Sequence, residues 1–600
     1  MYTRFALLFS YLFIFLVGVF YYPKWEQNKT EATLSWDASG YYLYLPAFFI
    51  YEDVKELVFM PQVLEQYQPT PDLQQAFLHE SGNQVMKYPI GQAIQFSPFF
   101  AIAHLVAVNH PTYPADGFSY PYQLAIGLGG LLICFIGLFF LSKILQYYFE
   151  DRTAALTLLI IALITNYLEY GAITNAMTHN NLFTIYTILI WLSIHFHKKP
   201  TFARAAGIGI CVGLAALTRP TEIIACLIPV FWGMSSWKML SKRLEFFSKH
   251  WQKLAVAIVL TASIGMIQLF YWKYATGDWI VYSYEDQGFS WLRPHFINGI
   301  FKFRAGWLVY TPVMIFALIG FYFLYQKERS IFWASLVFSS IFIYITFAWD
   351  IWWYGGSLGQ RAMVQAYPIL ALPLAAFVDW SWQKRVWKYL FFGILLLFTY
   401  YNLWMTHQAH KGGLLRPGDM TRPYFWAVVG RYEIEEEKLK LLDTNELFKG
   451  NREEVKSLFL ADFNTVISDT IQLNGDYAQS PPYGLQIDYI HQFSPPFTVQ
   501  RAEIPENANW LRASAHFVVP YKEWEMWKMA QLQMQFLKGE KVVKKRKIRL
   551  HRLLKDEEWR ELWLDSKIPR KDFDRVEVRI WNAGSPKQIF VDDLEIESFR

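Results

Sequence analysis

Long apolar runs recur through the first two thirds of the chain and then stop. Eleven of them are long enough to cross a hydrocarbon core of ~30 Å as helices. They are Phe5–Tyr22, Tyr120–Leu145, Thr153–Tyr170, Leu182–Phe196, Ala203–Leu217, Ile223–Met234, Leu254–Tyr271, Gly306–Tyr325, Ile331–Ala348, Ala362–Val378 and Val386–Met405. The pattern predicts a polytopic α-helical membrane domain over residues 1–430, with about eleven transmembrane helices.

The pattern changes in the last quarter of the chain. Residues 457–600 contain segments in which apolar and polar residues alternate, which is the period of a half-buried strand. The nine segments are Val466–Leu473, Tyr483–Ile490, Phe497–Ile504, Trp510–Val519, Gln531–Leu537, Val542–Leu550, Trp559–Leu564, Arg575–Ile580 and Gln588–Ile596. They predict a C-terminal all-β sandwich, jelly-roll-like, after a charged helical linker at 431–456.

Charge divides the chain at the same place. Residues 431–600 hold 56 charged side chains, whereas the first 430 residues hold 51. This contrast excludes a cytosolic enzyme, a secreted disulfide scaffold and a disordered protein. The net charge of +5 gives no indication of nucleic-acid binding. The three cysteines all lie in apolar runs, which predicts neither a disulfide nor a thiolate metal site.

Basic residues mark every second connector between the runs. They gather at residues 143–152, 198–204, 238–253, 327–329 and 384–388. Because cytoplasmic connectors are enriched in Lys and Arg, these connectors and the N-terminus are predicted to be cytoplasmic. The remaining connectors (23–119, 171–181, 218–222, 272–305 and 349–361) and the C-terminal domain are then extracytoplasmic. We expect an integral protein of the bacterial inner membrane.

Two segments leave an alternative open. Ile90–Val108 is apolar enough to span, but a span there would move every basic connector to the outside. We therefore predict a helix that lies on, or dips into, the outer face. The runs beside Arg219 and Pro220 could form one kinked helix, which would move residues 238–253 outside, so we favour a hairpin.

Polar and ionisable residues of the membrane domain concentrate where the runs meet the outer connectors. The clusters lie at 36–42 with 87–91, at 175–181, at 219–222, at 282–307 and at 350–361. Charge inside a membrane is costly and marks function, and the middles of the runs carry almost none, which disfavours an ion-coupled transporter. The arrangement indicates an enzyme whose lipid-linked substrate keeps its tail in the bilayer. Its phosphate and sugar would meet Arg, Lys and a carboxylate base at the interface.

Four motifs in these clusters occur in a fixed order. They are Asp37-Ala-Ser-Gly-Tyr-Tyr-Leu-Tyr-Leu-Pro46, Lys87-Tyr-Pro-Ile-Gly91, Gly213-Leu-Ala-Ala-Leu-Thr-Arg219-Pro220-Thr221 and Trp353-Tyr-Gly-Gly-Ser-Leu-Gly-Gln-Arg361. In order and sidedness they resemble the GT-C superfamily of integral membrane glycosyltransferases, nearest to its protein O-mannosyltransferase and aminoarabinose transferase branch. The resemblance covers about residues 1–430.

The resemblance implies a dolichyl- or undecaprenyl-phosphate sugar donor and transfer on the outer face to a glycan, lipid or protein. It also implies that Asp37 acts as the base or orients the acceptor. Many relatives have a second essential acid in the same loop; here Glu52, Asp53 and Glu80 are the candidates, without a clear match. Relatives in this branch need no metal, and we expect none.

Eight further residues are candidates for substrate binding. They are Lys87, Tyr88, His179, Arg219, Glu285, Asp350, Tyr354 and Arg361. Structural alternatives stand beside them. Asp37 could cap a helix that starts at Ser39. Lys87 could be a lysine that reaches the interface. Asp350 and Arg361 could pair with each other and lock the last outer loop.

The end of the C-terminal domain has its own resemblance. The sequences of Val576–Asn582 and Ile589–Ile596 resemble those of carbohydrate-binding-module and galactose-binding-like jelly rolls. This implies contact with glycan, or a structural Ca²⁺ near Asp592 and Asp593; the alternative is a packing domain without a ligand. The basic face of Lys541–Arg549 is expected to be solvated, or to touch anionic glycan or lipid.

Three hypotheses of function follow. The first is a glycosyltransferase that uses a polyprenyl-phosphate sugar, with Asp37 as general base. The second is a transporter or flippase of lipid-linked glycan, and the third is a non-catalytic envelope scaffold that binds glycan. Only the first depends on Asp37 for the formation of a new glycosidic bond.

Overall fold

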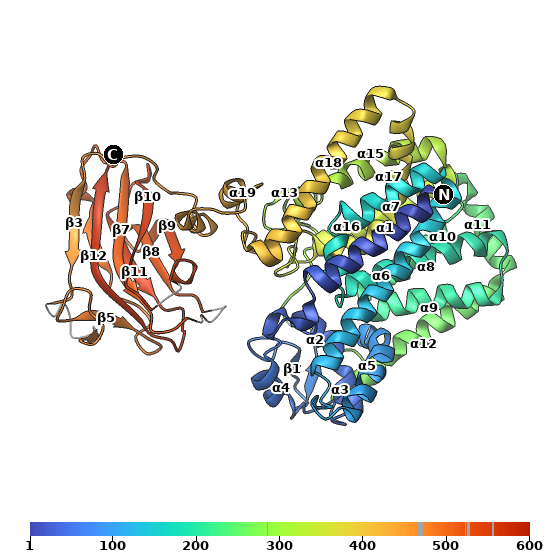
Figure 1. Ribbon diagram of the computed structural model, residues 1–600, viewed down its shortest axis with the longest axis horizontal. Helices are drawn as coiled ribbons and strands as arrows, with labels where there is room; N and C mark the ends of the chain where they lie inside the picture. The colour runs from blue at the N-terminus through green and yellow to red at the C-terminus, as the bar shows by residue number, and fades with distance from the viewer. Residues whose placement is uncertain (285, 465–471, 523, 525–527, 555–556) are drawn as a thin grey trace. The chain divides into compact units, whose positions relative to one another are not determined.

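The computed structural model describes residues 1–600 apart from 285, 465–471, 523, 525–527 and 555–556 (Figure 1). The chain divides into two compact units, Met1–Gly418 and Asp419–Arg600. Residues 419–430, which we assigned to the membrane domain, belong to the second unit.

The first unit is mainly helical. Its described α-helices are α1 (Tyr2–Leu16), α2 (Trp36–Tyr42), α3 (Tyr44–Phe49), α4 (Met60–Tyr67), α5 (Gly91–Asn109), α6 (Tyr120–Tyr148), α7 (Asp151–Leu163), α8 (Thr178–Lys198), α9 (Phe202–Thr218), α10 (Leu227–Phe231), α11 (Leu240–Lys249), α12 (Trp251–Thr276), α13 (Phe296–Phe301), α14 (Trp307–Tyr310), α15 (Ile315–Lys327), α16 (Arg329–Ala348), α17 (Tyr367–Trp382) and α18 (Arg385–His407). A small hairpin, β1 (Ala76–Leu78) with β2 (Gln84–Met86), lies in the first long connector.

Seven helical segments among the described residues are long and apolar enough to cross a membrane. They are Tyr2–Glu26, Gly91–Asn109, Tyr120–Tyr148, Trp251–Thr276, Arg329–Ala348, Arg361–Trp382 and Arg385–Gly412. Six coincide with predicted runs. The seventh is α5, which we placed on the outer face rather than across the membrane. The predicted count of eleven is therefore not confirmed.

The other predicted runs form shorter or more polar helices. Proline explains two of them, because it lacks the N–H that continues a helix. Pro220 follows the end of α9, and Pro312 separates α14 from α15. In α8 the first turn, which contains His179, is polar and lowers the hydropathy of an otherwise apolar helix.

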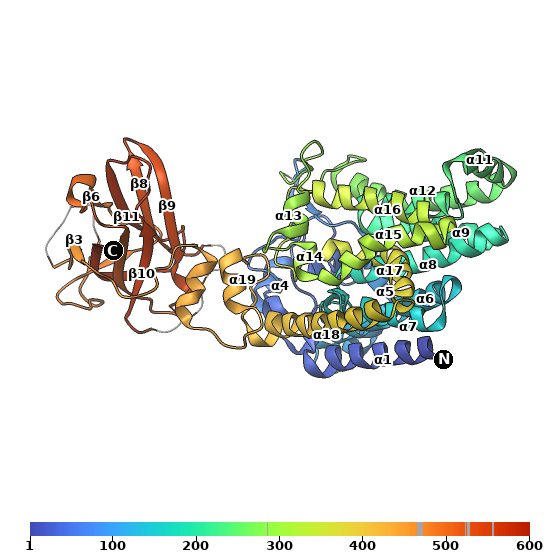
Figure 2. The same cartoon turned by 90° about the horizontal axis from the view of Figure 1, so that it is seen from above.

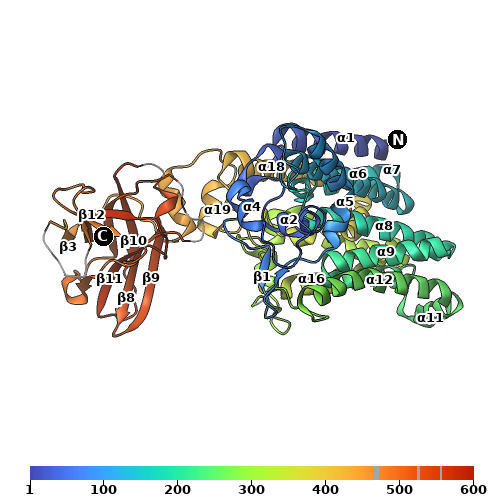
Figure 3. The ribbon, with the colours of Figure 1, turned by 90° about the horizontal axis from the view of Figure 1, so that it is seen from below.

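The helices of the bundle pack in close pairs. α9 packs on α12, α6 on α8 and α15 on α17, and α8, α9 and α12 run side by side (Figures 1 and 3). Glycine permits the closest approaches: a Cβ at Gly209 would overlap the carbonyl oxygen of Ala257, and one at Gly320 that of Pro373. Small residues at such contacts are typical of helices that associate in membranes.

One end of the bundle carries the first long connector. α2, α3 and α4 gather there with the β1–β2 hairpin and α5 (Figure 1). α2 and α3 both pack on α5. This end is where the sequence placed the candidate chemistry.

The second unit contains two antiparallel sheets in separate layers (Figure 2). One has the order β10-β7-β12-β5-β4 with β3 beside β12, and the other has the order β6-β11-β8-β9. The strands are β3 (Lys456–Ala461), β4 (Leu473–Asn474), β5 (Gly484–Ile487), β6 (Phe497–Gln500), β7 (Trp510–Val518), β8 (Gln531–Lys538), β9 (Lys541–Arg549), β10 (Arg560–Lys567), β11 (Arg575–Trp581) and β12 (Ile589–Phe599).

The predicted β-sandwich is thus present in the described residues. Leu532, Met534 and Phe536 of β8 alternate inward and are fully buried, as the period-two pattern requires. Most of the predicted strand Val466–Leu473 lies outside the described residues. The predicted linker helix at 431–456 is instead a 3₁₀ segment, Glu436–Leu442, followed by irregular chain and the start of β3.

Candidate functional site

Asp37 lies in the first turn of α2 and meets two side chains from distant segments. Arg361 Nη2 lies 2.5 Å from Asp37 Oδ2 and donates a hydrogen bond to it. The hydroxyl of Tyr88 donates to Asp37 Oδ1 over 2.8 Å. Three of the four motifs that define the resemblance therefore converge on one carboxylate.

This geometry disagrees with the structural alternative, in which Asp37 caps a helix that starts at Ser39. α2 begins at Trp36, with Ser35 as the residue before it, so Asp37 is inside the helix and does not precede Ser39 as a cap. Both of its oxygens bind side chains of other segments. The carboxylate therefore connects segments of the fold instead of capping the helix.

The charge state of Asp37 follows from these partners. Burial acts to raise the pKa of the carboxyl, but the charge of Arg361, the hydrogen bonds from Tyr88 and Arg361, and the charge of Lys87 outweigh it. The pKa lies below its usual value, so Asp37 is ionised at neutral pH. Its side chain remains 27% exposed, which leaves the carboxylate accessible.

Tyr88 is held by α2 itself. Its ring packs where a Cβ at Gly40 would overlap it, and it lies 4.5 Å from the ring of Tyr41. The edge of Tyr284 meets Tyr88 at a centroid distance of 6.2 Å. These three tyrosines form an aromatic wall beside Asp37, which we call the tyrosine wall.

Lys87 is tied to the fourth outer connector. Its backbone oxygen accepts a hydrogen bond of 2.7 Å from Ser283, and its Nζ lies 5.9 Å from the ring centroid of Tyr284. Its positive charge contributes to the lowered pKa of Asp37. Glu285, predicted in this connector, lies outside the described residues.

Arg219 follows the last residue of α9 and reaches the same group of residues. Its guanidinium lies 5.5 Å from the ring centroid of Tyr354, whose hydroxyl donates to the backbone oxygen of Thr346 over 3.0 Å. The charges of Arg219 and Arg361 act on each other and on the buried hydroxyl of Tyr41. Two partly buried cations, Arg219 and Arg361, thus lie close to each other, and one of them pairs with Asp37.

His179 lies in a chain of buried polar groups. Its Nδ1 is 2.8 Å from Gln365 Oε1, and Gln365 Nε2 donates to Glu222 Oε1 over 2.5 Å. The hydroxyl of Tyr186 donates to the other oxygen of Glu222. Gln365 shares the 3₁₀ segment Arg361–Ala366 with Arg361, so the chain supports the position of that arginine. The prediction omitted both Glu222 and Gln365, although a carboxylate three residues after Arg219 was a visible signal.

Asp350 lies in a different set of contacts. Its Oδ1 accepts a hydrogen bond of 2.6 Å from Ser290 and lies 4.0 Å from His295 Nε2. The alternative in which Asp350 pairs with Arg361 is wrong, because Arg361 pairs with Asp37.

A second contact between an acid and a distant side chain was not predicted from the sequence. Glu169 and His410 meet at 2.7 Å, and Thr174 also donates to Glu169. The contact joins the π-helical turn Glu169–Ile173, after α7, to the turn Gln408–Gly412, which follows α18. Tyr170, the residue after Glu169, lies edge-on to His179 at 5.7 Å. An acid inside an apolar run was the signal that could have revealed Glu169.

Two observations concern candidate ion ligands. No group of three or more His, Cys, Asp or Glu side chains suited to a metal occurs in the described residues. Asp592 accepts backbone N–H groups from Gln479, Ser480 and Asp593 at 2.8–2.9 Å. Both oxygens of Asp592 therefore accept hydrogen bonds from the backbone. Asp593 accepts the Ser480 hydroxyl instead.

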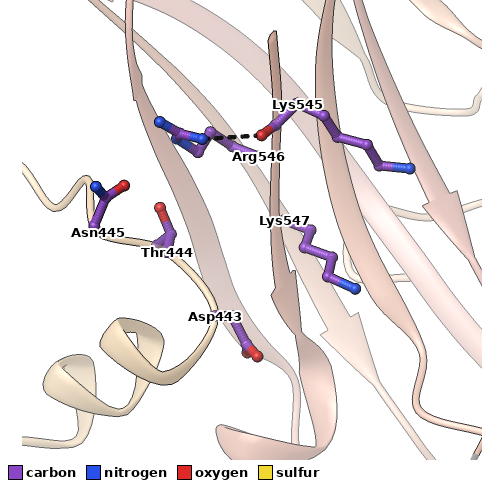
Figure 4. A pocket seen from close by; sticks show the side chains of 6 residues that line it. All are labelled: Asp443, Thr444, Asn445, Lys545, Arg546 and Lys547. Carbon is purple, nitrogen blue, oxygen red and sulfur yellow. Dashed lines mark hydrogen bonds between the residues drawn. The ribbon is translucent and has the colours of Figure 1, made fainter. Parts of the chain in front are cut away.

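The basic strand β9 is partly neutralised within its own unit. Lys544 and Arg546 both pair with Glu446, at 2.7 and 2.9 Å. Lys545 and Lys547 point to the other side of the strand (Figure 4). Asp443, Thr444 and Asn445 join Lys545, Arg546 and Lys547 around a shallow cavity of about 410 Å³.

No family model and no curated protein matches the chain. Solved structures that match part of it include the CBM22-1 xylan-binding domain of Xyn10C from Paenibacillus barcinonensis, at 8% identity and a TM-score of 0.18, over 25% of this chain and 97% of that one. A family 16 carbohydrate-binding module matches at 9% identity and a TM-score of 0.16, over 23% and 89%. The arabinose-bound α-L-arabinofuranosidase MgGH51 matches at 14% and 0.14, over 25% and 23%. Such values assign neither a ligand nor an activity.

Proposed function

We propose that the chain is a glycosyltransferase that moves a sugar from a polyprenyl-phosphate-linked donor to an acceptor at the outer membrane-water interface. The observation that carries the proposal is the convergence of Asp37, Tyr88 and Arg361 on one point, with Arg219 and Lys87 close by. These side chains come from segments far apart in the sequence, next to helices apolar enough to lie in a bilayer.

The cations suit a lipid phosphate. Arg219, Arg361 and Lys87 outnumber the two carboxylates that act on them, Asp37 and Glu222. A guanidinium group can bind phosphate with two parallel hydrogen bonds, whereas the ammonium group of lysine acts as a point charge. We infer that the donor phosphate, when it binds, replaces Asp37 as the ion-pair partner of Arg361. Arg219 and Lys87 would then neutralise the remaining charge of the phosphate.

Asp37 is suited to act as the base. It is ionised at neutral pH, and release of Arg361 to the phosphate would free one of its oxygens. That oxygen would accept the proton of an acceptor hydroxyl as the hydroxyl oxygen bonds to the anomeric carbon. The bond between that carbon and the phosphate oxygen breaks, and the polyprenyl phosphate leaves with the electron pair. The tyrosine wall of Tyr41, Tyr88 and Tyr284 would face the sugar.

The test is transfer by purified protein in proteoliposomes supplied with radiolabelled polyprenyl-phosphate sugars and an envelope extract as acceptor. We expect Asp37→Asn to fold normally and to lower transfer by about 100-fold or more, the usual contribution of a positioned base. Asp278→Asn, which changes an exposed loop carboxylate, is the matched control and should transfer at the wild-type rate.

Three results would overturn the proposal. Full transfer by Asp37→Asn would show that Asp37 is not the base. Movement of lipid-linked sugar between leaflets without a new glycosidic bond would indicate a flippase. Glycan binding that needs no donor and is unchanged by substitution of Asp37 and Arg361 would indicate a scaffold.

A further inference from the structure

A cavity of about 370 Å³ lies at the end of the helical bundle opposite the candidate site. Helix α8 connects the two ends: His179 lies in its first turn near Arg361, and His197 lies in its last turn beside the cavity. The 18 residue steps from His179 to His197 span about 27 Å at ~1.5 Å per residue, close to the hydrocarbon thickness of a bilayer. The cavity is therefore separate from the site described above.

Among the residues that the structure describes, the cavity is lined by three cations and no acid. Arg243 and Lys242 come from α11, and Lys198 comes from the end of α8. Aromatic and aliphatic side chains, among them Tyr148 and Trp232, make up much of the remaining wall. A cationic and aromatic lining is suited to an anion that carries an apolar part.

Arg243 supplies the strongest evidence for a ligand. Only 9% of the residue is exposed, and within the described part of the chain no carboxylate lies within ion-pair distance of it. Its Nη1 donates to His197 Nδ1 over 2.7 Å, and its Nη2 donates to the backbone oxygen of Trp232. Its Nε has no hydrogen-bond partner among the described residues. A buried guanidinium with a free donor and no counter-ion is costly unless an anion joins it.

His197 fixes the orientation of that guanidinium. Its Nε2 lies 2.7 Å from the backbone oxygen of Pro229, to which it donates, so its Nδ1 is the acceptor that receives the Arg243 hydrogen. The imidazole is therefore neutral and rigidly placed. This contact holds the guanidinium of Arg243 in the cavity wall, so that the position of its Nε is fixed.

The surroundings indicate a lipid as the source of the anion. Leu244 is 63% exposed on α11, and Trp251, at the start of α12, is 63% exposed. Exposed apolar side chains beside a basic pocket between membrane helices are suited to acyl chains, whereas a free phosphate ion would not need them. We propose that this cavity binds the phosphate headgroup of an anionic phospholipid, held by Arg243, Lys242 and Lys198.

The test measures lipid binding to the full-length protein in detergent, by native mass spectrometry, with phosphatidylglycerol and phosphatidylcholine of identical acyl chains. Wild type should bind phosphatidylglycerol about fivefold tighter or more. The double variant Lys198→Gln, Lys242→Gln should bind phosphatidylglycerol about tenfold more weakly than wild type does. Each lysine near the surface contributes at most about fivefold to the affinity. Both lysines are exposed, so the variant keeps the fold.

A matched control removes two exposed basic residues from another connector. Lys384→Gln, Arg385→Gln should bind phosphatidylglycerol as wild type does. Arg243→Gln should abolish the preference, provided its melting temperature shows that it folds. Equal binding of the two lipids, or equal losses in the cavity and control variants, would overturn the proposal. Displacement of the lipid by millimolar inorganic phosphate, with no effect of acyl chains, would assign the cavity to a soluble phosphate and would also overturn it.

Discussion

Asp37 is an acid whose neighbours hold it ionised despite its burial. Arg361 and Tyr88 occupy one oxygen each, and they differ in what they would do during the proposed reaction. Arg361 is a charge that a phosphate would attract away. Tyr88 is neutral and packed against Gly40, so it would stay and keep the carboxylate oriented.

The substitution Tyr88→Phe isolates that hydrogen bond. It keeps the ring on Gly40 and Tyr41 but removes a bond that favours the charged form of Asp37, so the pKa of Asp37 rises. A base works only when deprotonated. The acid limb of the pH profile of transfer should therefore move to higher pH. Tyr51→Phe is the control, and an unmoved acid limb in Tyr88→Phe would contradict the assignment.

A second residue-scale prediction concerns Lys440 in the second unit. It is 3% exposed, its Nζ lies 3.2 Å from the ring centroid of Trp563, and burial lowers its pKa from 10.5 to about 7. Between these two pH values the unfolded chain holds the proton and the folded chain releases it. Stability therefore rises with pH across this window, and below pH 7 the cost of burying the charge is fully present.

Lys440→Met removes this dependence. We expect it to stabilise the second unit at pH 6 on the order of 3 kcal/mol, and by much less at pH 9, where the wild-type lysine is largely neutral. Hydrogen exchange of β7 and β10 peptides in the full-length protein, corrected for intrinsic rates, measures the difference. Lys438→Met, a more exposed neighbour, should show no such dependence. An equal gain at both pH values would contradict the lowered pKa.

At the scale of elements, the strands were easier to predict than the helices. Eight of the nine predicted strand segments largely overlap a described strand, because alternation is a local signal that also fixes which face is buried. The missed strand β3 pairs with β12, far along the chain, and its sequence of Lys-Ser-Leu-Phe-Leu-Ala does not alternate between polar and apolar residues, so it gives no local strand signal. Apolar runs revealed the helices but not their ends, which depend on prolines and on buried polar turns.

Close helix pairs lead to an element-scale prediction. Gly320 of α15 packs against Pro373 of α17 so tightly that a Cβ would overlap backbone, whereas Gly265 of α12 has open space around it. Gly320→Ala should destabilise the first unit by about 1–3 kcal/mol through overpacking. Gly265→Ala should be neutral or slightly stabilising, since alanine favours a helix. Thermal unfolding in detergent compares the two, and equal melting temperatures would contradict the packing.

At the scale of the whole chain, the charge contrast predicted two parts, and the structure has two units. The candidate site was predictable in part. Asp37, Tyr88 and Arg361 meet, as the order of the motifs suggested. Gln365 and Glu169 were missed because each is a single polar residue in a predicted apolar run, and only packing shows that it has a partner. Glu222 lies in the predicted cluster at 219–222 but was not among the candidate site residues.

The predicted orientation is testable on the intact molecule. In a background without the three native cysteines, a membrane-impermeant thiol reagent added to right-side-out vesicles should label Ser81→Cys and spare Ser248→Cys. Both serines are exposed, and they lie in connectors predicted to be on opposite sides. Permeabilised vesicles, in which both should react, are the control. Labelling of Ser248→Cys in sealed vesicles would reverse the topology.

The most direct test of the central claim is a structure of the protein bound to undecaprenyl phosphate. We predict density for the phosphate next to Arg361 and Arg219. Asp37 should be released from its ion pair with Arg361, and the freed oxygen of Asp37 should face the tyrosine wall. Phosphate density elsewhere, with the pair between Asp37 and Arg361 intact, would contradict it.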